Sequence, residues 1–226
     1  MADLKLYYSP GACSLAPHIA LEEAGADFEP VRLNFADGEQ RKPEYLSINP
    51  KGRVPALAER DWVLTENPAI LSYIARRYPG AGLWPHDARD EARCAEWLAW
   101  ITSTIHPAYA HVRRPERYAD DEAAKAAVVA KGRETCRELW SAVDRRLGPG
   151  LWAVGERYSV ADPYVFVFWT WGRGPTLGFD MMRELPNWTA HARRMWERRA
   201  VRAAFEREGL QMPADAFGPQ PANALS

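Results

Sequence analysis

"YYSPGACSLAPHIALEEAGADFEPVRLNF", residues 7–35, decides the fold of the first part of the chain. The run Leu4–Tyr8 is typical of a short strand, and residues 14–24 have helical spacing that stops before Gly25. A second strand-like run follows at residues 28–33. These elements predict a βαβ unit, with Cys13 at the point where the first strand gives way to the helix.

The position of Cys13 suggests a reactive thiol. The start of a helix offers unpaired N–H groups and the positive end of the helix dipole, and both favour a thiolate over a thiol. The alternative is that Cys13 is a small buried apolar residue, as most free cysteines are.

The composition limits the classes of function. The chain has 226 residues, of which 47% are hydrophobic, enough for one large domain or two modest ones. With 29 Lys and Arg against 30 Asp and Glu, the formal charge is -1, so the overall charge predicts neither a nucleic-acid partner nor an acidic membrane surface. The arginine-rich residues 191–208 also contain Glu at helical spacing, which we interpret as a solvated helix face.

Cysteine usage and the N-terminal sequence indicate location. Cys13, Cys94 and Cys136 are too scattered for a disulfide framework, which is typical of a reducing compartment. We see neither a signal-peptide pattern nor an apolar run long enough to cross a bilayer, so we expect a cytoplasmic protein with no membrane partner.

The pattern of elements changes in kind near residue 87. Before it, strand-like runs at 55–58 and 62–64 predict a β-hairpin, and helical spacing predicts a helix at 68–78. After it, four long helical segments are predicted, at 91–105, 121–147, 160–171 and 188–208. We therefore predict an α/β domain at 1–81, an all-helical domain at 88–210 and a loose tail at 211–226.

Glu66 and Asn67 are candidates for binding a small peptide. Asn67 before Pro68 is a helix-start signature, and the helix start can bind an anion through its free N–H groups. The Glu66 carboxylate beside it could hold an ammonium group. Together they suit the α-amino-acid end of a peptide, although helix capping alone also explains the pattern.

Other motifs are consistent with such a site. Val54-Pro55 opens a strand at which the proline cannot donate to a sheet, and Lys51 and Arg53 could meet a carboxylate or be ordinary surface charges. Ser159 and Asp162 have capping-box spacing, which has a structural meaning only. His106 is a candidate site residue, and no cluster has the spacing of a metal site.

Four motifs in this order resemble the cytosolic glutathione transferases. They are the segments 7–21, 49–57 (NPKGRVPAL), 65–70 (TENPAI) and 159–162 (SVAD), and the cysteine-bearing opening resembles the bacterial beta class. The resemblance covers about residues 4–210. It implies a thioredoxin-like N-terminal domain, an all-helical C-terminal domain, a homodimer, and glutathione as co-substrate with no bound cofactor.

The resemblance also implies residue roles. Cys13 lies beside the glutathione sulfur, Val54 pairs its backbone with the cysteinyl part ahead of a cis Pro55, and Glu66 and Asn67 hold the γ-glutamyl end. His106 matches a histidine that reaches the site from the helical domain. The chain departs from the beta class at three positions of that helix, with Ala99, Thr104 and Pro107 where the class often has Asn, Glu and Lys. For the glycyl carboxylate the candidate cations are Arg41, Lys42 and Arg53.

For the second substrate we expect a small hydrophobic electrophile. The pocket for it is predicted to contain Tyr109, Val112, Trp169 and Trp171, with core packing as the alternative for both tryptophans. Conjugation of the glutathione thiolate to the electrophile is the first hypothesis. The alternatives are a thiol transferase, or a disulfide or peroxide reductase, that uses Cys13 in a mixed disulfide, and a non-catalytic protein that carries hydrophobic ligands.

Overall fold

The first part of the chain is a four-stranded mixed sheet. The computed structural model describes residues 3–217. In the sheet the strand order is β2 (Glu29–Arg32), β1 (Leu4–Tyr8), β3 (Ala56–Glu59) and β4 (Trp62–Thr65). β1 pairs parallel to β2 and antiparallel to β3, and β3 pairs antiparallel to β4. The predicted βαβ unit and hairpin are both confirmed, and no boundary of their strands and helix differs from the prediction by more than one residue.

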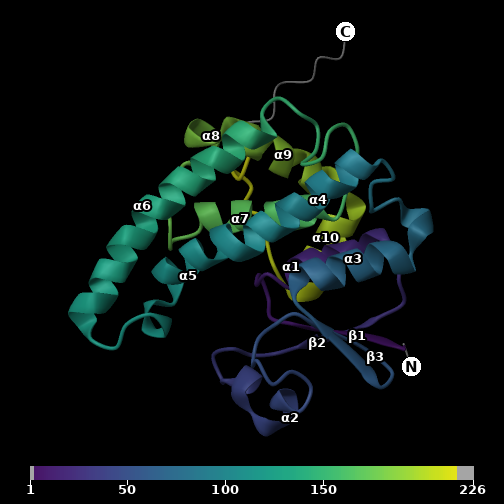
Figure 1. Ribbon diagram of the computed structural model, residues 1–226, viewed down its shortest axis with the longest axis horizontal. Coiled ribbons are helices and arrows are strands. Elements are labelled where there is room, and N and C mark those ends of the chain that lie inside the picture. Colours follow the sequence, from purple (N-terminus) through teal and green to yellow (C-terminus); the bar gives the residue numbers. More distant parts are fainter. Residues whose placement is uncertain (1–2, 218–226) are drawn as a thin grey trace.

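Helices cover both faces of this sheet. Leu4, Leu6 and Tyr8 alternate with less buried residues along β1, so one side of the strand faces the main core. α1 (Leu15–Glu23) and α3 (Asn67–Arg77) pack beside one another over that face, between the strands and the helical part (Figure 1). Tyr45 of the short helix α2 (Pro43–Leu46) belongs to a smaller cluster with Val54 and Ala56 on the other face.

The second part of the chain is helical. Its elements are α4 (Ala88–Trp100), α5 (His106–Arg113), α6 (Glu122–Leu147), α7 (Ala161–Arg173), α8 (Met181–Glu184), α9 (Pro186–Glu197) and α10 (Arg199–Glu208). α7 is buried along almost its whole length and packs against α1, α4 and α9. Around it, Trp97, Trp140, Trp169 and Trp188 are fully buried. The arrangement is the predicted thioredoxin-like part followed by an all-helical part.

Two predicted helices differ from the observed ones. The helix expected to stop at residue 105 continues through a π turn, η3 (Ile101–Ile105), into α5. Pro107 lacks an N–H to donate to the preceding turn, which accounts for the wider turn there. The single helix expected at 188–208 is two helices, because Arg198 has extended backbone between α9 and α10.

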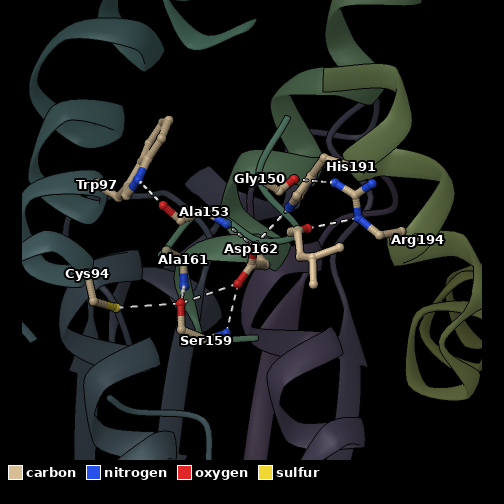
Figure 2. A network of polar contacts seen from close by, with 10 residues as sticks. Cys94, Trp97, Gly150, Ala153, Ser159, Ala161, Asp162, His191 and Arg194 are labelled. Carbon is tan, nitrogen blue, oxygen red and sulfur yellow. Dashed lines mark hydrogen bonds and ion pairs between the residues drawn. The ribbon is translucent and has the colours of Figure 1, made fainter. Parts of the chain in front are cut away.

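Asp162 fixes the start of α7 (Figure 2). Its buried carboxylate accepts hydrogen bonds from the backbone N–H groups of Ser159 and Ala153, each at 2.7 Å, and lies 2.8 Å from Nε2 of His191 on α9. One half of the predicted capping box is therefore present, the bond from the Ser159 N–H to Asp162, whereas the Ser159 hydroxyl accepts from the Ala161 N–H and not from that of Asp162. The Asp162 carboxylate also ties α9 to α7. Pro163 is tolerated because the N–H groups of the first helical turn have no partner within the helix.

The two parts of the chain are joined by polar contacts at the loop before α1. Glu208, at the end of α10, accepts from the Gly11 N–H at 2.9 Å and lies 2.8 Å from Nδ1 of His18 on α1. Trp171 of α7 donates to the Gly11 carbonyl at 2.8 Å. The Gly11 peptide groups are thus held by α7 and α10 together.

The segment expected to be a loose tail is packed where it is described. Phe217 stacks on Trp169 with ring centroids 5.2 Å apart, and Ala216 is buried. For residues 213–217 the expectation therefore differs from the structure, because an aromatic side chain finds an apolar surface to cover. Residues 218–226 lie outside the described part of the chain. Between residues 3 and 217, none of the helices combines the length and apolar character that a bilayer span requires.

We predict that replacing Asp162 with Asn lowers the free energy of unfolding by about 3 kcal/mol. The amide nitrogen of Asn would face a backbone N–H that now donates to a carboxylate oxygen, so a buried donor would lose its acceptor. Urea unfolding followed by circular dichroism measures the change. Asp61→Asn, in the exposed turn between β3 and β4, is the matched control and should leave the midpoint unchanged. An unaltered midpoint for Asp162→Asn would contradict this account of the network.

Candidate functional site

Two adjoining hollows lie between the sheet part and the helical part. The first has a volume of about 380 Å³ and the second about 590 Å³. Cys13, Arg53, Val54 and His106 line both of them. The first pocket also contains Glu66, Asn67 and Pro55, so the predicted peptide-binding residues other than the candidate cations Arg41 and Lys42 are brought to one place.

Cys13 is buried at the junction of the two pockets. It is 8% exposed, its Sγ donates to the Val54 carbonyl at 3.4 Å, and its own carbonyl accepts from Asn67 Nδ2 at 3.1 Å. Burial raises the pKa of the Cys13 thiol to about 12 and outweighs the lowering by the Asn67 contact. For Cys13 this direction is opposite to the one expected from the helix start, because loss of solvation exceeds the effect of the helix start.

Glu66 has a strained backbone at the edge of the first pocket. Its φ is 74° and its ψ 122°, a conformation that a residue with a side chain seldom adopts. Such strain costs about 1–3 kcal/mol and is concentrated at functional sites. The exposed carboxylate of Glu66 pairs with Lys51 Nζ at 2.6 Å. A cationic ligand group at this place would meet a carboxylate that already binds an ammonium.

Asn67 does not cap the helix as predicted. It is the first residue of α3, its predecessor Glu66 holds the cap position, and the Asn67 side chain turns inward to the Cys13 carbonyl. Asn67 Oδ1 is buried without a hydrogen-bond partner among the described residues. The residue therefore lines the pocket and also fixes the cysteine loop.

The segment from Arg53 to Pro55 forms one wall of both pockets. The Arg53 carbonyl accepts from Tyr45 Oη at 2.6 Å and from Asn49 Nδ2 at 2.7 Å, which holds the loop before β3. The Val54–Pro55 peptide bond is cis, as the resemblance implied. β3 itself lies inside the sheet, and its pairing begins at Ala56, so only the residues before it are open to another partner.

His106 reaches both pockets from the start of α5. Its ring lies edge-on to Phe168 and Trp171, at centroid distances of 5.4 Å and 5.3 Å. Burial and then the positive charge of Arg117 lower the pKa of His106 to about 4. At neutral pH the ring is uncharged, so it can donate or accept a hydrogen bond but supplies no positive charge.

Of the four residues predicted for the second pocket, the structure places two there. Tyr109 and Trp171 line it and stack at a centroid distance of 4.5 Å. Val112 instead packs against Gly132, where an added Cβ would lie 2.9 Å from its side chain. Trp169 is fully buried and donates to Thr189 Oγ1 at 3.2 Å. Val112 and Trp169 are corrected to core residues, since each points to a neighbouring helix.

Sequence reasoning missed several residues of the site. Tyr164 of α7 lines the first pocket, with its hydroxyl 3.3 Å from Thr102 Oγ1, and burial raises its pKa. Its signal was present, because it follows Asp162 in a motif that was interpreted as structural only. Arg113, Arg114 and Arg117 line the second pocket, and Arg117 also lines the first, but nothing in their spacing indicated that they would meet. Of the candidate cations for the glycyl carboxylate, Arg41 lines the second pocket only, and Lys42 lines neither pocket.

Other candidate sites are less suited to chemistry. A wider hollow of about 860 Å³ lies between α1 and α10, but its charged groups form pairs with each other, such as Arg198 with Glu23 and Arg207 with Glu22. Within residues 3–217 there is no cluster of three or more His, Cys, Asp or Glu side chains that could hold a metal ion.

Comparison with known proteins identifies relatives of the whole chain. Residues 2–76 match the family model of the glutathione S-transferase N-terminal domain, and residues 126–194 match that of the C-terminal domain. A curated relative from Xanthomonas campestris, named glutathione S-transferase GST-4.5, is 34% identical over 92% of this chain and 100% of its own length.

Solved structures agree with these matches. A glutathione transferase homologue from Sulfitobacter, solved with bound glutathione, is 40% identical with a TM-score of 0.87 and covers 93% of this chain and 100% of the other. A beta-class glutathione S-transferase from Sphingomonas chungbukensis is 38% identical with a TM-score of 0.76, over 92% and 100%.

We predict that Cys13 reacts slowly with iodoacetamide in the protein without ligand. With its pKa raised to about 12, only about one thiol in ten thousand is ionised at pH 8, and the thiolate is the reacting form. Alkylation of the Cys13 peptide, followed by mass spectrometry, should be more than about a hundredfold slower than that of free glutathione. The rate should still rise with pH at pH 10, and a plateau below pH 8 would contradict the assignment.

Proposed function

The chain belongs to the glutathione S-transferase family, and from that premise we propose which residues carry out the transfer. The enzyme joins the thiol of glutathione to the electrophilic carbon of a second substrate. The observation that supports this best is that Cys13, Val54 and Glu66 line a single pocket at the starts of α1 and α3.

We assign the first pocket to glutathione. Glu66 holds the α-ammonium of the γ-glutamyl group, and it can exchange Lys51 for that group because both side chains are more than half exposed. The N–H groups at the start of α3 face the adjoining carboxylate. Val54 and cis Pro55 lie before the sheet pairing, which starts only at Ala56, so their backbone faces the cysteinyl part, and within the protein the Val54 carbonyl accepts from the Cys13 thiol.

We assign to Cys13 the role of a hydrogen-bond donor. A thiol whose pKa is about 12 stays protonated, and its Sγ–H already donates to a carbonyl oxygen at 3.4 Å. Beside a glutathione sulfur, the same donor would favour the thiolate form of the ligand. These observations favour assistance over nucleophilic attack by Cys13, because attack requires the thiolate.

The second pocket then holds the electrophile. Tyr109 and Trp171 offer a stacked aromatic surface, and His106 lies between the two pockets as an uncharged ring. The glutathione sulfur forms a bond to carbon, and the leaving group departs with the electron pair of the broken bond. Holding both reactants in adjoining pockets supplies the proximity contribution to the rate.

We also propose the setting in which the enzyme works. The division at residues 81 and 88 separates a glutathione domain from a domain that supplies most of the second pocket, and the protein forms a homodimer. Trp62 and Val63, 43% and 38% exposed on the outer strand β4, support an interface there. Three free, buried cysteines support a cytoplasmic location.

Glutathione should bind to the purified protein, and Glu66→Gln should weaken that binding about five- to tenfold. The variant loses the charge that faces the α-ammonium but keeps a similar shape, and the estimate is modest because Glu66 is exposed. Isothermal titration calorimetry gives both dissociation constants, with Glu44→Gln on α2 as an exposed control of the same charge change. If the wild type takes up no glutathione, the assignment of the pocket is wrong.

Cys13→Ala separates conjugation from redox chemistry. If Cys13 only donates a hydrogen bond, the variant keeps conjugation of chlorodinitrobenzene with kcat/KM lowered about ten- to thirtyfold. If Cys13 forms a mixed disulfide, the variant loses all disulfide reductase activity while the wild type is an efficient reductase. Parallel assays of both activities, with Cys13→Ser as the isosteric comparison, decide the matter. A wild type without either activity would leave a ligand-binding protein.

A further inference from the structure

The walls of the second pocket carry an excess of positive charge. Five arginines line it: Arg41, Arg53, Arg113, Arg114 and Arg117. Glu116 is the only acidic residue among those that line it in the described part of the chain. The whole chain has a formal charge of -1, so this concentration of arginine is local.

These arginines are not neutralised by neighbouring acids. Among residues 3–217, none of the five guanidinium groups is within ion-pair distance of a carboxylate, although many other basic side chains on the surface are paired. Partial burial, followed by the charges of Arg53 and Arg114, lowers the pKa of Arg117. Arg117 is therefore close enough to Arg53 and Arg114 for their charges to repel, and an anion between them would relieve that repulsion.

Three of the five come from one short segment. Arg113 ends α5, and Arg114 and Arg117 belong to the turn that contains η4 (Pro115–Arg117), so the helical part contributes them together. Arg41 and Arg53 come from the sheet part. Charges from both parts of the chain thus meet over the aromatic surface of Tyr109 and Trp171.

We propose that the second substrate is an aromatic or conjugated electrophile that carries a carboxylate, held by the arginines of residues 113–117. This rests on the proposed function, because it names the substrate class of the same site. A planar guanidinium matches a carboxylate with two hydrogen bonds, and a stacked aromatic floor suits a flat ring. The glycyl carboxylate of glutathione needs one cation, for which Arg53 and Arg117 line both pockets, and this leaves Arg113 and Arg114, which line only the second pocket, for the second substrate.

The test uses a pair of aryl chlorides that differ in one charge. The anionic probe is chlorodinitrobenzoate with the chlorine para to the carboxylate, and the neutral probe is its methyl ester. In both, the glutathione thiolate forms the carbon–sulfur bond and chloride leaves with the electron pair of the carbon–chlorine bond. Each kcat/KM is divided by the uncatalysed rate with glutathione, because the ester is intrinsically more reactive.

The normalised preference for the anion should exceed about tenfold at low salt and should decline as salt is added. Replacing Arg113, Arg114 and Arg117 together with Gln should lower this preference at least about tenfold, whereas replacing them with Lys should retain most of it because the charges remain. Arg145→Gln on the exposed side of α6 removes the same kind of charge elsewhere and should change nothing. Thermal unfolding checks that each variant is folded.

Several outcomes overturn the proposal. If the wild type has the same normalised kcat/KM for both probes, the proposal of a carboxylate-bearing substrate is wrong, while the proposed function stands. A triple Gln variant that loses affinity for glutathione by calorimetry, with the preference unchanged, would assign the arginines to the glycyl carboxylate instead. If the triple Gln variant is unfolded, the triple Lys variant and the salt dependence of the wild type test the proposal instead. A preference for the anionic probe that does not decline with added salt then contradicts it. No conjugation of either probe or of chlorodinitrobenzene would reject the proposed function itself.

Discussion

One buried carboxylate determines where the central helix begins. Asp162 binds two backbone N–H groups at 2.7 Å and the ring of His191, so it fixes the loop before α7, the first turn of α7 and the position of α9 at once. The rest of the site depends on that helix. α7 carries Tyr164 to the first pocket and Trp171 to the second, about two turns apart on one rigid element. A buried charge requires several partners to offset its lost solvation, and here these partners come from three separate segments.

The loop that carries the cysteine is held by both parts of the chain. Trp171 and Glu208 of the helical part hold the two sides of Gly11, and Asn67 of α3 holds the carbonyl of the buried Cys13. That burial decides the chemistry. The start of a helix and the Asn67 contact favour a thiolate, but desolvation is the larger effect and raises the pKa of Cys13 to about 12. A thiol that remains protonated is better suited to stabilise a neighbouring thiolate by a hydrogen bond than to attack as a nucleophile itself.

The concentration of positive charge at the second pocket also depends on contacts between distant segments. The overall formal charge of -1 gave no reason to expect a cationic pocket. The arginines at residues 113–117 reach the site only because the π turn at 101–105 carries α5 onward beside α6, and because Gly132 lets those two helices approach closely. Arg41 and Arg53 complete the group from loops that follow β2 and precede β3. In the proposed function, second-substrate specificity therefore arises where the two parts meet.

The sequence by itself determined the strands, most helices and the order of the two parts, because each depends on local spacing or on a contiguous motif. For the same reason it singled out four residues that line one pocket and that we propose to bind the peptide, Cys13, Val54, Glu66 and Asn67. The predictions from the sequence were wrong where a residue's surroundings depend on its neighbours in space. Val112 and Trp169 have the same apolar character as the pocket residues Tyr109 and Trp171, and only the packing of α6 and α9 assigns them to the core. The protonation of Cys13 and His106, and the gathering of five arginines, likewise depend on burial and long-range charge, which the chain acquires only when distant segments exclude water together.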